Sequence, residues 1–220
     1  MSVPYAPPAS SSRRPQEDLA AVVGLARFFS PGSDMEANSL YANAERLFML
    51  LDERQIPHLL VGGLALVFHA EARNTEDVDL IMALSDLDRL PELTITDRNE
   101  WFAKAAYGPL QVDILLTENP LFAEVAAKHA ETRDYRGHRL RVATPVGLLL
   151  LKLYALPSLY RQGQIARAAL YESDLALLLL SHPVADETLL GALRPHLIES
   201  DVNALADVLS DVRGRMERKF

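Results

Sequence analysis

The stretch over residues 60–80 constrains the fold of this chain most, because it combines a Gly-Gly pair with two aspartates in an apolar segment. An apolar segment over 58–61 runs directly into Gly62 and Gly63 and predicts a buried strand. Glycines let backbone N–H groups approach a ligand where a side chain would block the way. If 64–69 turns helically, its N-terminus faces the same point and adds a place for phosphate oxygens. This part therefore predicts a phosphate-binding turn between a strand and a helix.

The second part of the stretch places two carboxylates on one side of a strand. Asp77 and Asp79 alternate with Val78 and Leu80, so in a strand both carboxylates point to the same face. Adjacent carboxylates repel each other, and the usual remedies are a shared proton or a bound divalent cation. A phosphate-binding turn beside a metal-binding pair suggests nucleotide chemistry.

These residues resemble the signature of the nucleotidyltransferase superfamily, a Gly-Gly or Gly-Ser pair followed by Asp-x-Asp. Here thirteen residues separate Gly63 from Asp77, and Gly63 stands where the Gly-Ser form has a serine. Arg73 and Thr75 match the Arg-x-Thr-x-Asp-x-Asp-Leu motif of the AbiEii-like branch, which contains toxins of type IV toxin–antitoxin systems. The resemblance extends over residues 37–180, and it implies that Gly62, Gly63, Arg73 and Thr75 contact the nucleotide.

A third aspartate lies in a second apolar segment. Residues 110–116 are predicted to form a strand that would bury Asp113, and an ionised carboxylate there needs a partner or a metal. The resemblance implies a third metal ligand, since the superfamily often has a third carboxylate on a later strand. The alternative is an aspartate that pairs with Arg73 or caps a turn.

Two further charges stand in apolar helices. Thr144 and Pro145 are predicted to open a helix that is apolar over 146–156 apart from Lys152, and Asp174 interrupts the next helix. An unpaired buried charge is costly, so one interpretation is an interhelical salt bridge between them. The resemblance implies a second: Lys152 contacts the triphosphate, and Asp174 orients it or assists the acceptor. The two interpretations are compatible.

The remaining pattern predicts an α/β fold, in which a small mixed sheet is flanked by helices and followed by a helical C-terminal region. We divide the chain into a disordered tail over 1–16, an α/β core over 17–143 and a helical region over 144–220. Residues 93–104 carry no clear pattern. The further expectations are helices over 18–29, 36–54, 119–129, 164–180 and within 186–220, a helix capped by Ser85, helix ends at Pro157 and Gly214, and a hairpin over 135–139.

Composition favours a soluble cytoplasmic protein. The chain of 220 residues contains no cysteine, which excludes disulfides and thiolate zinc sites and fits a reducing cytosol. No apolar run reaches the roughly 20 residues that a transmembrane helix needs. A net charge of −8 argues against a broadly basic nucleic-acid-binding surface, although a local patch could still hold one RNA end.

The resemblance implies that an acceptor hydroxyl attacks the α-phosphate of a nucleoside triphosphate, with Mg²⁺ or Mn²⁺ held by Asp77, Asp79 and Asp113. Lys152 and Asp174 complete the expected catalytic residues, and Asp113 is also the best candidate to accept the acceptor's proton. The AbiEii-like branch implies an RNA acceptor such as the tRNA 3′ end, and a partner antitoxin. Two alternatives remain: an enzyme that modifies a small molecule or a protein, and a protein of this fold that only binds a nucleotide or a partner.

Overall fold

The computed structural model describes most of the chain, namely residues 34–70, 75, 77–135 and 137–218, without the side chains of 34–41 and 135. The expected tail over 1–16 and the expected helix over 18–29 lie outside these residues, as does Arg73. Within the described ranges, no helix is long and apolar enough to cross a membrane.

A mixed sheet forms the centre of the described residues. Its strands are β1 (Leu59–Val61), β2 (Asp77–Met82), β3 (Thr94–Arg98), β4 (Phe102–Tyr107), β5 (Leu110–Leu116), β6 (Ala130–Tyr135) and β7 (His138–Ala143). They form one seven-stranded sheet in the order β3-β4-β5-β2-β1-β7-β6. β2 is parallel to β5 and β1 is parallel to β7, whereas the other neighbours are antiparallel. The expected mixed sheet is confirmed.

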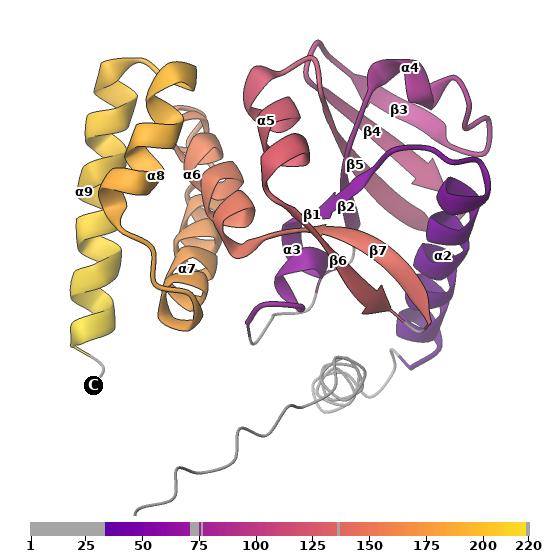
Figure 1. Ribbon diagram of the computed structural model, residues 1–220, viewed down its shortest axis with the longest axis horizontal. Coiled ribbons are helices and arrows are strands. Elements are labelled where there is room, and N and C mark those ends of the chain that lie inside the picture. The colour runs from indigo at the N-terminus through magenta and orange to yellow at the C-terminus, as the bar shows by residue number, and fades with distance from the viewer. Residues whose placement is uncertain (1–33, 71–74, 76, 136, 219–220) are drawn as a thin grey trace, which may run out of the picture.

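Helices flank this sheet and make up the C-terminal region (Figure 1). They are α2 (Asp34–Glu53), α3 (Gly62–Leu66), α4 (Leu84–Leu87), α5 (Pro120–Lys128), α6 (Pro145–Arg161), α7 (Ile165–Ser181), α8 (Asp186–Leu193), the 3₁₀ turn η1 (Arg194–His196) and α9 (Glu199–Glu217). In Figure 1, α6 to α9 lie together on one side of the molecule and α2 lies at the far side of the sheet. α6 joins this helical group to the rest, because it also contacts α3, α5 and β7.

The starts of α5 and α6 follow from their sequences. Asn119 Oδ1 accepts hydrogen bonds from the N–H groups of Leu121 and Phe122, at 3.0 and 3.4 Å. Thr144 Oγ1 accepts one from the N–H of Gly147 at 3.3 Å. In each helix a proline occupies the first turn, where its missing N–H costs nothing. Both predicted helix starts are confirmed.

α2 buries one stripe of its surface against the sheet. Ala44, Leu47, Phe48 and Leu51 recur at helical spacing and are at most 2% exposed. α2 contacts β5, and α5 contacts β2 and β5 from the side where the C-terminal helices lie (Figure 1). One face of the sheet is thus sealed by α2, whereas the other carries the charged residues described below.

Three predicted helix boundaries are wrong. Ser85 lies inside α4 and does not cap it. At the start of α4, Oε1 of Glu118 accepts a hydrogen bond from the N–H of Leu84 at 3.4 Å. Pro157 lies inside α6, because tight burial of this part of the helix outweighs the hydrogen bond that proline removes. Gly214 lies inside α9, which continues to Glu217.

The hairpin of β3 and β4 fills the segment that had no clear pattern. All residues of β3 are exposed, so the apolar alternation that signals a half-buried strand is missing there. The expected hairpin over 135–139 is confirmed, since β6 and β7 pair antiparallel with Tyr135 opposite His138. The division of the chain at residue 143 stays a prediction, although the sheet ends with β7 at that residue.

Candidate active site

Three aspartates meet on two adjacent strands. Asp79 of β2 lies opposite Asp113 of β5 in the parallel register, and Asp77 precedes Asp79 by two residues on the same face. A carboxylate oxygen from each of the three lies within 4.8 Å of the others. All three side chains are half-buried. The structure therefore brings together the three residues that were expected to bind a metal.

Gly62 is required at its position by both space and backbone geometry. Val61 pairs with Asp79 across β1 and β2, so Gly62 follows directly beside that carboxylate. Its φ of +66° lies in the left-handed region, and a Cβ there would overlap the carboxylate group of Asp79. The glycine thus lets the chain pass next to Asp79 without displacing it.

Gly63 and Thr75 fit against each other. A Cβ on Gly63 would lie 2.7 Å from Oγ1 of Thr75, so a serine would be crowded where the Gly-Ser form of the motif has one. Thr75 Oγ1 donates a hydrogen bond to Oδ1 of Asp77 at 2.7 Å. Thr75 therefore holds the first carboxylate in place. The contact of these residues with a nucleotide stays a prediction.

The electrostatics of the site favour a bound cation. Burial, and then the negative charges of Asp77 and Asp113, raise the pKa of Asp79 to about 7. Lys152 and a hydrogen bond from the backbone N–H of Gly63 act in the opposite direction but do not cancel this shift. A divalent cation among the three carboxylates would remove the repulsion, and carboxylate oxygens are the ligands that Mg²⁺ prefers.

Lys152 and Asp174 form a buried interhelical ion pair. Nζ of Lys152 on α6 lies 2.7 Å from Oδ2 of Asp174 on α7, and the two residues are 5% and 1% exposed. The expected salt bridge is thus confirmed. Lys152 also lines the pocket over the aspartates, whereas Asp174 lies behind it, outside the lining.

Two residues of α7 belong to the same region and were not predicted. These residues are Tyr171 and Arg167. Nζ of Lys152 lies 4.6 Å from the centre of the Tyr171 ring, and the guanidinium carbon of Arg167 lies 5.8 Å from it. The pKa of Arg167 is raised, first by Tyr171 and further by the charges of Asp113 and Asp79. Arg167, Tyr171 and Asp174 follow each other at steps of four and three, so the polar stripe on one helix face was a usable signal.

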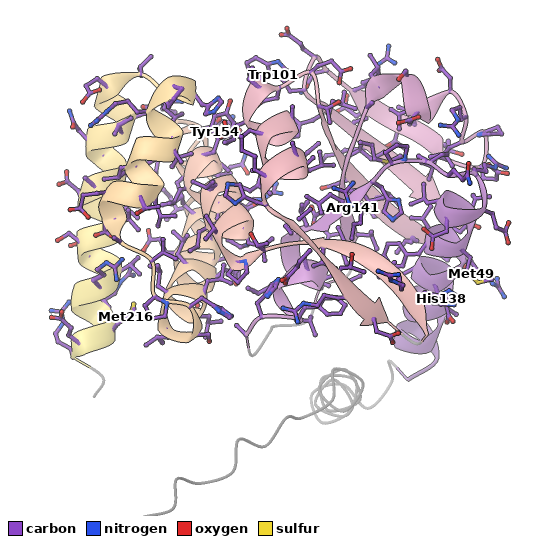
Figure 2. The ribbon with its side chains drawn as sticks, viewed as in Figure 1. Met49, Trp101, His138, Arg141, Tyr154 and Met216 are labelled. Carbon is purple, nitrogen blue, oxygen red and sulfur yellow. The ribbon has the colours of Figure 1, made fainter. Side chains whose placement is uncertain are left out.

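A pocket of about 480 Å³ lies over the carboxylates. Gly62, Asp79 and Asp113 line it from the sheet, and α6 and α7 line it with Lys152, Tyr171 and other residues. The end of the β3–β4 hairpin contributes the opposite wall, with Trp101 and Phe102 among its residues. Figure 2 labels Trp101 and Tyr154, two lining residues, on the side of the sheet where α5 and α6 lie.

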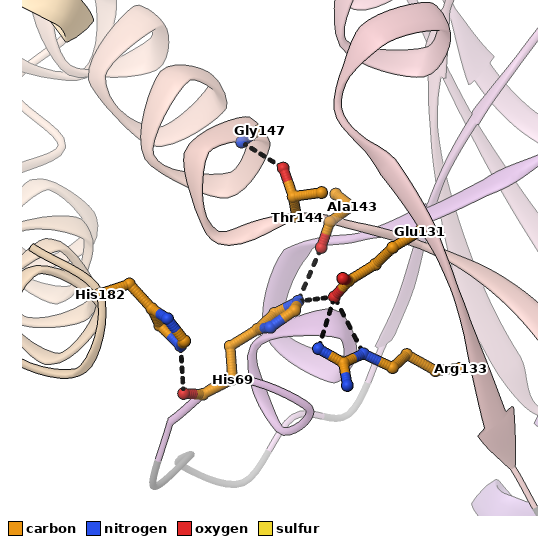
Figure 3. A network of polar contacts seen from close by, with 7 residues as sticks. All are labelled: His69, Glu131, Arg133, Ala143, Thr144, Gly147 and His182. Carbon is orange, nitrogen blue, oxygen red and sulfur yellow. Dashed lines mark hydrogen bonds and ion pairs between the residues drawn. The ribbon is translucent and has the colours of Figure 1, made fainter. Parts of the chain in front are cut away.

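His69 anchors the segment after α3 to the rest of the protein (Figure 3). Its Nε2–H donates to the carbonyl of Ala143 at 2.7 Å, and its own carbonyl accepts from Nε2–H of His182 at 3.0 Å. Burial lowers the pKa of His69, and Nδ1 has no hydrogen-bond partner among the described residues. This residue therefore ties α3 to β7 and α7 and has a structural role.

Comparisons with known proteins find a match only among solved structures. No protein-family model and no curated protein matches the chain. ANT(2″)-Ia in complex with adenylyl-2″-tobramycin is similar with a TM-score of 0.51 at 14% identity, over 74% of this chain and 95% of that chain. An antigenic nucleotidyltransferase-like protein from Paracoccidioides brasiliensis gives a TM-score of 0.52 at 15% identity, over 78% and 87%. The chain therefore has a nucleotidyltransferase-like α/β fold with a helical C-terminal region.

Proposed function

We propose that this chain is a metal-dependent nucleotidyltransferase, which moves a nucleoside monophosphate from a nucleoside triphosphate to an acceptor hydroxyl. The observation that carries the proposal is the meeting of Asp77, Asp79 and Asp113 within 4.8 Å beside Gly62, next to a pocket that Asp79, Asp113 and Lys152 line. The nucleotidyltransferase-like fold supports it. A protein that only bound nucleotide would not need three repelling carboxylates at this point.

The donor set fits Mg²⁺ or Mn²⁺. Three carboxylates from two strands offer hard oxygen ligands at one point, and Thr75 holds the first of them through Asp77 Oδ1. When bound, such ions supply positive charge at the phosphates and at the oxygens that react. Asp77, Asp79 and Asp113 are the residues that would hold them.

In the proposed reaction, an oxygen of the acceptor hydroxyl attacks the α-phosphorus in line with the leaving group. The bond from the α-phosphorus to the oxygen that bridges to the β-phosphate breaks, and pyrophosphate leaves. Asp113 accepts the proton of the acceptor hydroxyl. Charge on the triphosphate is balanced by Lys152 and by Arg167, and Asp174 positions Lys152 through the 2.7 Å ion pair.

The motif residues around Gly62 are proposed to lie along the triphosphate. Gly62 and Gly63 let the backbone lie directly against Asp79 and Thr75, because a Cβ on either glycine would overlap these side chains. Thr75 supports this placement, since it holds Asp77 toward the same point. Arg73 is proposed to contact the phosphates from the segment that precedes Thr75.

We propose an RNA 3′ end as the acceptor, with tRNA as the first candidate. The proposal is supported by Lys104, a pocket-lining lysine that is not assigned to the triphosphate and forms no ion pair among the described residues. The resemblance to AbiEii-like toxins adds a partner antitoxin that would restrain the activity. Such an enzyme would work in the cytoplasm, where tRNA and nucleoside triphosphates are available.

A small-molecule acceptor is the second candidate. It is favoured by the likeness to ANT(2″)-Ia, whose crystal contains tobramycin that carries an adenylyl group. A polycationic acceptor of that kind needs carboxylates to receive its ammonium groups. Among the described residues that line the pocket, Asp97 is the only carboxylate outside the metal site. We therefore rank this candidate below RNA.

The test is label transfer from a nucleoside triphosphate. Purified protein is incubated with each triphosphate labelled at the α-phosphate, Mg²⁺, and either total RNA or a set of aminoglycosides. We expect label on RNA with wild type and its loss with Asp113→Asn, because that variant removes a metal ligand and the proton acceptor. Asp207→Asn, an exposed aspartate on α9, serves as the matched control and is expected to retain full activity.

The possible outcomes of this experiment distinguish the three hypotheses: an RNA acceptor, a small-molecule acceptor and a protein that only binds nucleotide. Label on aminoglycosides and none on RNA would replace the first candidate by the second. Absence of transfer to any acceptor by a protein that still binds triphosphate would favour a binding protein of this fold. Transfer that survived Asp113→Asn unchanged would place the chemistry elsewhere.

A further inference from the structure

Trp101 is exposed at the edge of the pocket, which is unusual for the one tryptophan of the chain. Tryptophan has the largest side chain and is highly buried on average, yet Trp101 is 41% exposed. Within the described ranges, its indole stacks on no other ring. Its face is therefore available to a ligand in the pocket.

The backbone that carries Trp101 is held in place by the hairpin. Oδ1 of Asn99 accepts hydrogen bonds from the N–H groups of Trp101 and Phe102, each at 2.9 Å. The carbonyl of Trp101 accepts from the N–H of Leu116 at 2.8 Å. An indole on a fixed backbone loses little conformational entropy when a ligand packs on it.

Phe102 extends this surface, and its ring packs against other aromatic side chains. Its ring packs edge to face on Phe122 with centroids 5.3 Å apart, and Phe122 packs on Tyr154 of α6 in the same way at 5.8 Å. Nδ2 of Asn119 donates to the hydroxyl of Tyr154 at 3.0 Å. This row connects the hairpin to α5 and α6, while Phe102 itself stays 41% exposed.

A lysine, Lys104, lies beside the aromatic pair, with Asp97 of β3 and Asp113 of β5 as its cross-strand neighbours. Lys104 lies opposite Asp113 in the register of β4 and β5, on the face of the sheet that carries the carboxylates. Its side chain is exposed and lines the pocket. Among the described residues no carboxylate forms an ion pair with it, unlike Arg161, which pairs with Asp201 at 2.7 Å. Lys104 can therefore neutralise a phosphate.

We propose that Trp101, Phe102 and Lys104 form the acceptor subsite, which holds the terminal nucleotide of an RNA 3′ end. The terminal base stacks on Trp101 and Phe102, and a backbone phosphate lies at Lys104. This inference rests on the proposed function, which places the triphosphate and the acceptor on opposite sides of the reacting phosphate. It adds the residues that select a base-bearing acceptor.

The hairpin is assigned to the acceptor because of where it lies relative to Asp113. In-line transfer places the attacking hydroxyl on the side opposite the leaving pyrophosphate. Asp113, the proposed proton acceptor, lies on β5. In the sheet order, β4 is on one side of β5, whereas β1, which Gly62 directly follows, is on the other. The triphosphate takes the side of Gly62 and Lys152, so the acceptor takes the side of β4.

Trp101 fluorescence gives a direct test, because no other tryptophan contributes to the signal. Full-length protein is titrated with a short single-stranded RNA with a free 3′ hydroxyl, and separately with a nucleoside triphosphate and Mg²⁺. We expect quenching by the RNA alone and none by the triphosphate. Quenching by the triphosphate alone would assign the stacked base to that substrate and overturn the acceptor subsite.

Variants supply the second measurement. Trp101→Ala is expected to weaken RNA binding about tenfold in an anisotropy assay with labelled RNA, with an unchanged KM for the triphosphate. Lys104→Ala is expected to lower the slope of log affinity against log salt by about 1, whereas Lys128→Ala, an exposed lysine on α5, leaves it unchanged.

Failure of the subsite and failure of the proposed function give different results. Transfer to RNA that is unaffected by Trp101→Ala, with unchanged RNA affinity, would overturn the subsite and leave the proposed function standing. Quenching by RNA and tenfold weaker binding in the variant, without any label transfer by wild type, would support RNA binding at these three residues and overturn both their role as an acceptor subsite and the proposed function.

Discussion

Lys152 reaches from α6 to Asp174 on α7, with Nζ 2.7 Å from Oδ2, and both side chains are buried. The same lysine lowers the pKa of Asp79 and lines the pocket. One residue thus links the packing of the C-terminal helices to the charge of the carboxylate site. Stability and activity should therefore respond to it separately.

Substitution of Lys152 tests this double role. Lys152→Met leaves Asp174 buried without its cation and is expected to cost about 3–5 kcal/mol in the free energy of unfolding. The double variant Lys152→Met/Asp174→Leu is expected to recover most of that stability, as measured by urea titration. It is not expected to recover nucleotidyl transfer. Lys128→Met, which removes an exposed pair with Glu124, should cost ~1 kcal/mol or less. A stable double variant with full activity would leave Lys152 a structural role only.

A methyl group at Gly62 should disable the site. Gly62→Ala forces a Cβ into the Asp79 carboxylate and a side chain onto a φ of +66°. We expect a loss of about 2 kcal/mol or more in stability and of transfer activity, by thermal unfolding and label transfer. Gly191→Ala is the matched control, since a Cβ there meets nothing within 4 Å, and helical alanine should stabilise α8 by about 0.5–1 kcal/mol.

The raised pKa of Asp79 makes the stability of the metal-free protein depend on pH. A carboxyl whose pKa is about 7 in the folded state and 3.8 otherwise binds more protons when folded, so its contribution to stability falls as pH rises through that interval. Without metal, Asp79→Asn should be more stable than wild type at about pH 8 and not at about pH 4. Urea titrations with a chelator present measure this difference. An equal difference at both pH values would contradict it.

Tyr171 holds Lys152 over the face of its ring, and its hydroxyl accepts a hydrogen bond from Arg167. The ring lies beneath Lys152 and Arg167, and a cation over an aromatic face gains about 0.5–2 kcal/mol. Tyr171→Leu is expected to raise KM for the triphosphate by about tenfold, because both cations lose their support. Tyr171→Phe keeps the ring under Lys152 but loses the hydrogen bond to Arg167, so its KM is expected to lie between those of wild type and Tyr171→Leu. A Tyr171→Phe variant as impaired as Tyr171→Leu would show that the hydroxyl carries the effect.

Local patterns were sufficient to predict the half of the site that lies on the sheet. Alternation placed Asp77 and Asp79 on one face, and the apolar run over 110–116 gave β5 with its correct bounds. Charges isolated in apolar helices identified Lys152 and Asp174 as partners, because only pairing makes their burial tolerable. The capping residue Thr144 and the following Pro145 predicted the start of α6.

The remaining parts depend on tertiary packing that no local pattern encodes. β3 is exposed along its whole length, so the hairpin that carries Trp101 had no hydrophobic signal. Pro157 continues a helix because its neighbours are buried on several sides. The spacing of Arg167, Tyr171 and Asp174 indicates one polar face of α7, but the placement of α7 across the pocket from the sheet is what makes Arg167 and Tyr171 site residues.

The position of the transferred label tests nucleotidyl transfer most directly. Two reactions receive the same triphosphate, labelled at the α-phosphate in one and at the γ-phosphate in the other, with Mg²⁺ and RNA. We predict that only the α-label enters the RNA, that pyrophosphate is released in equal amount, and that Asp113→Asn abolishes both. Transfer of the γ-label, or incorporation without pyrophosphate release, would contradict it.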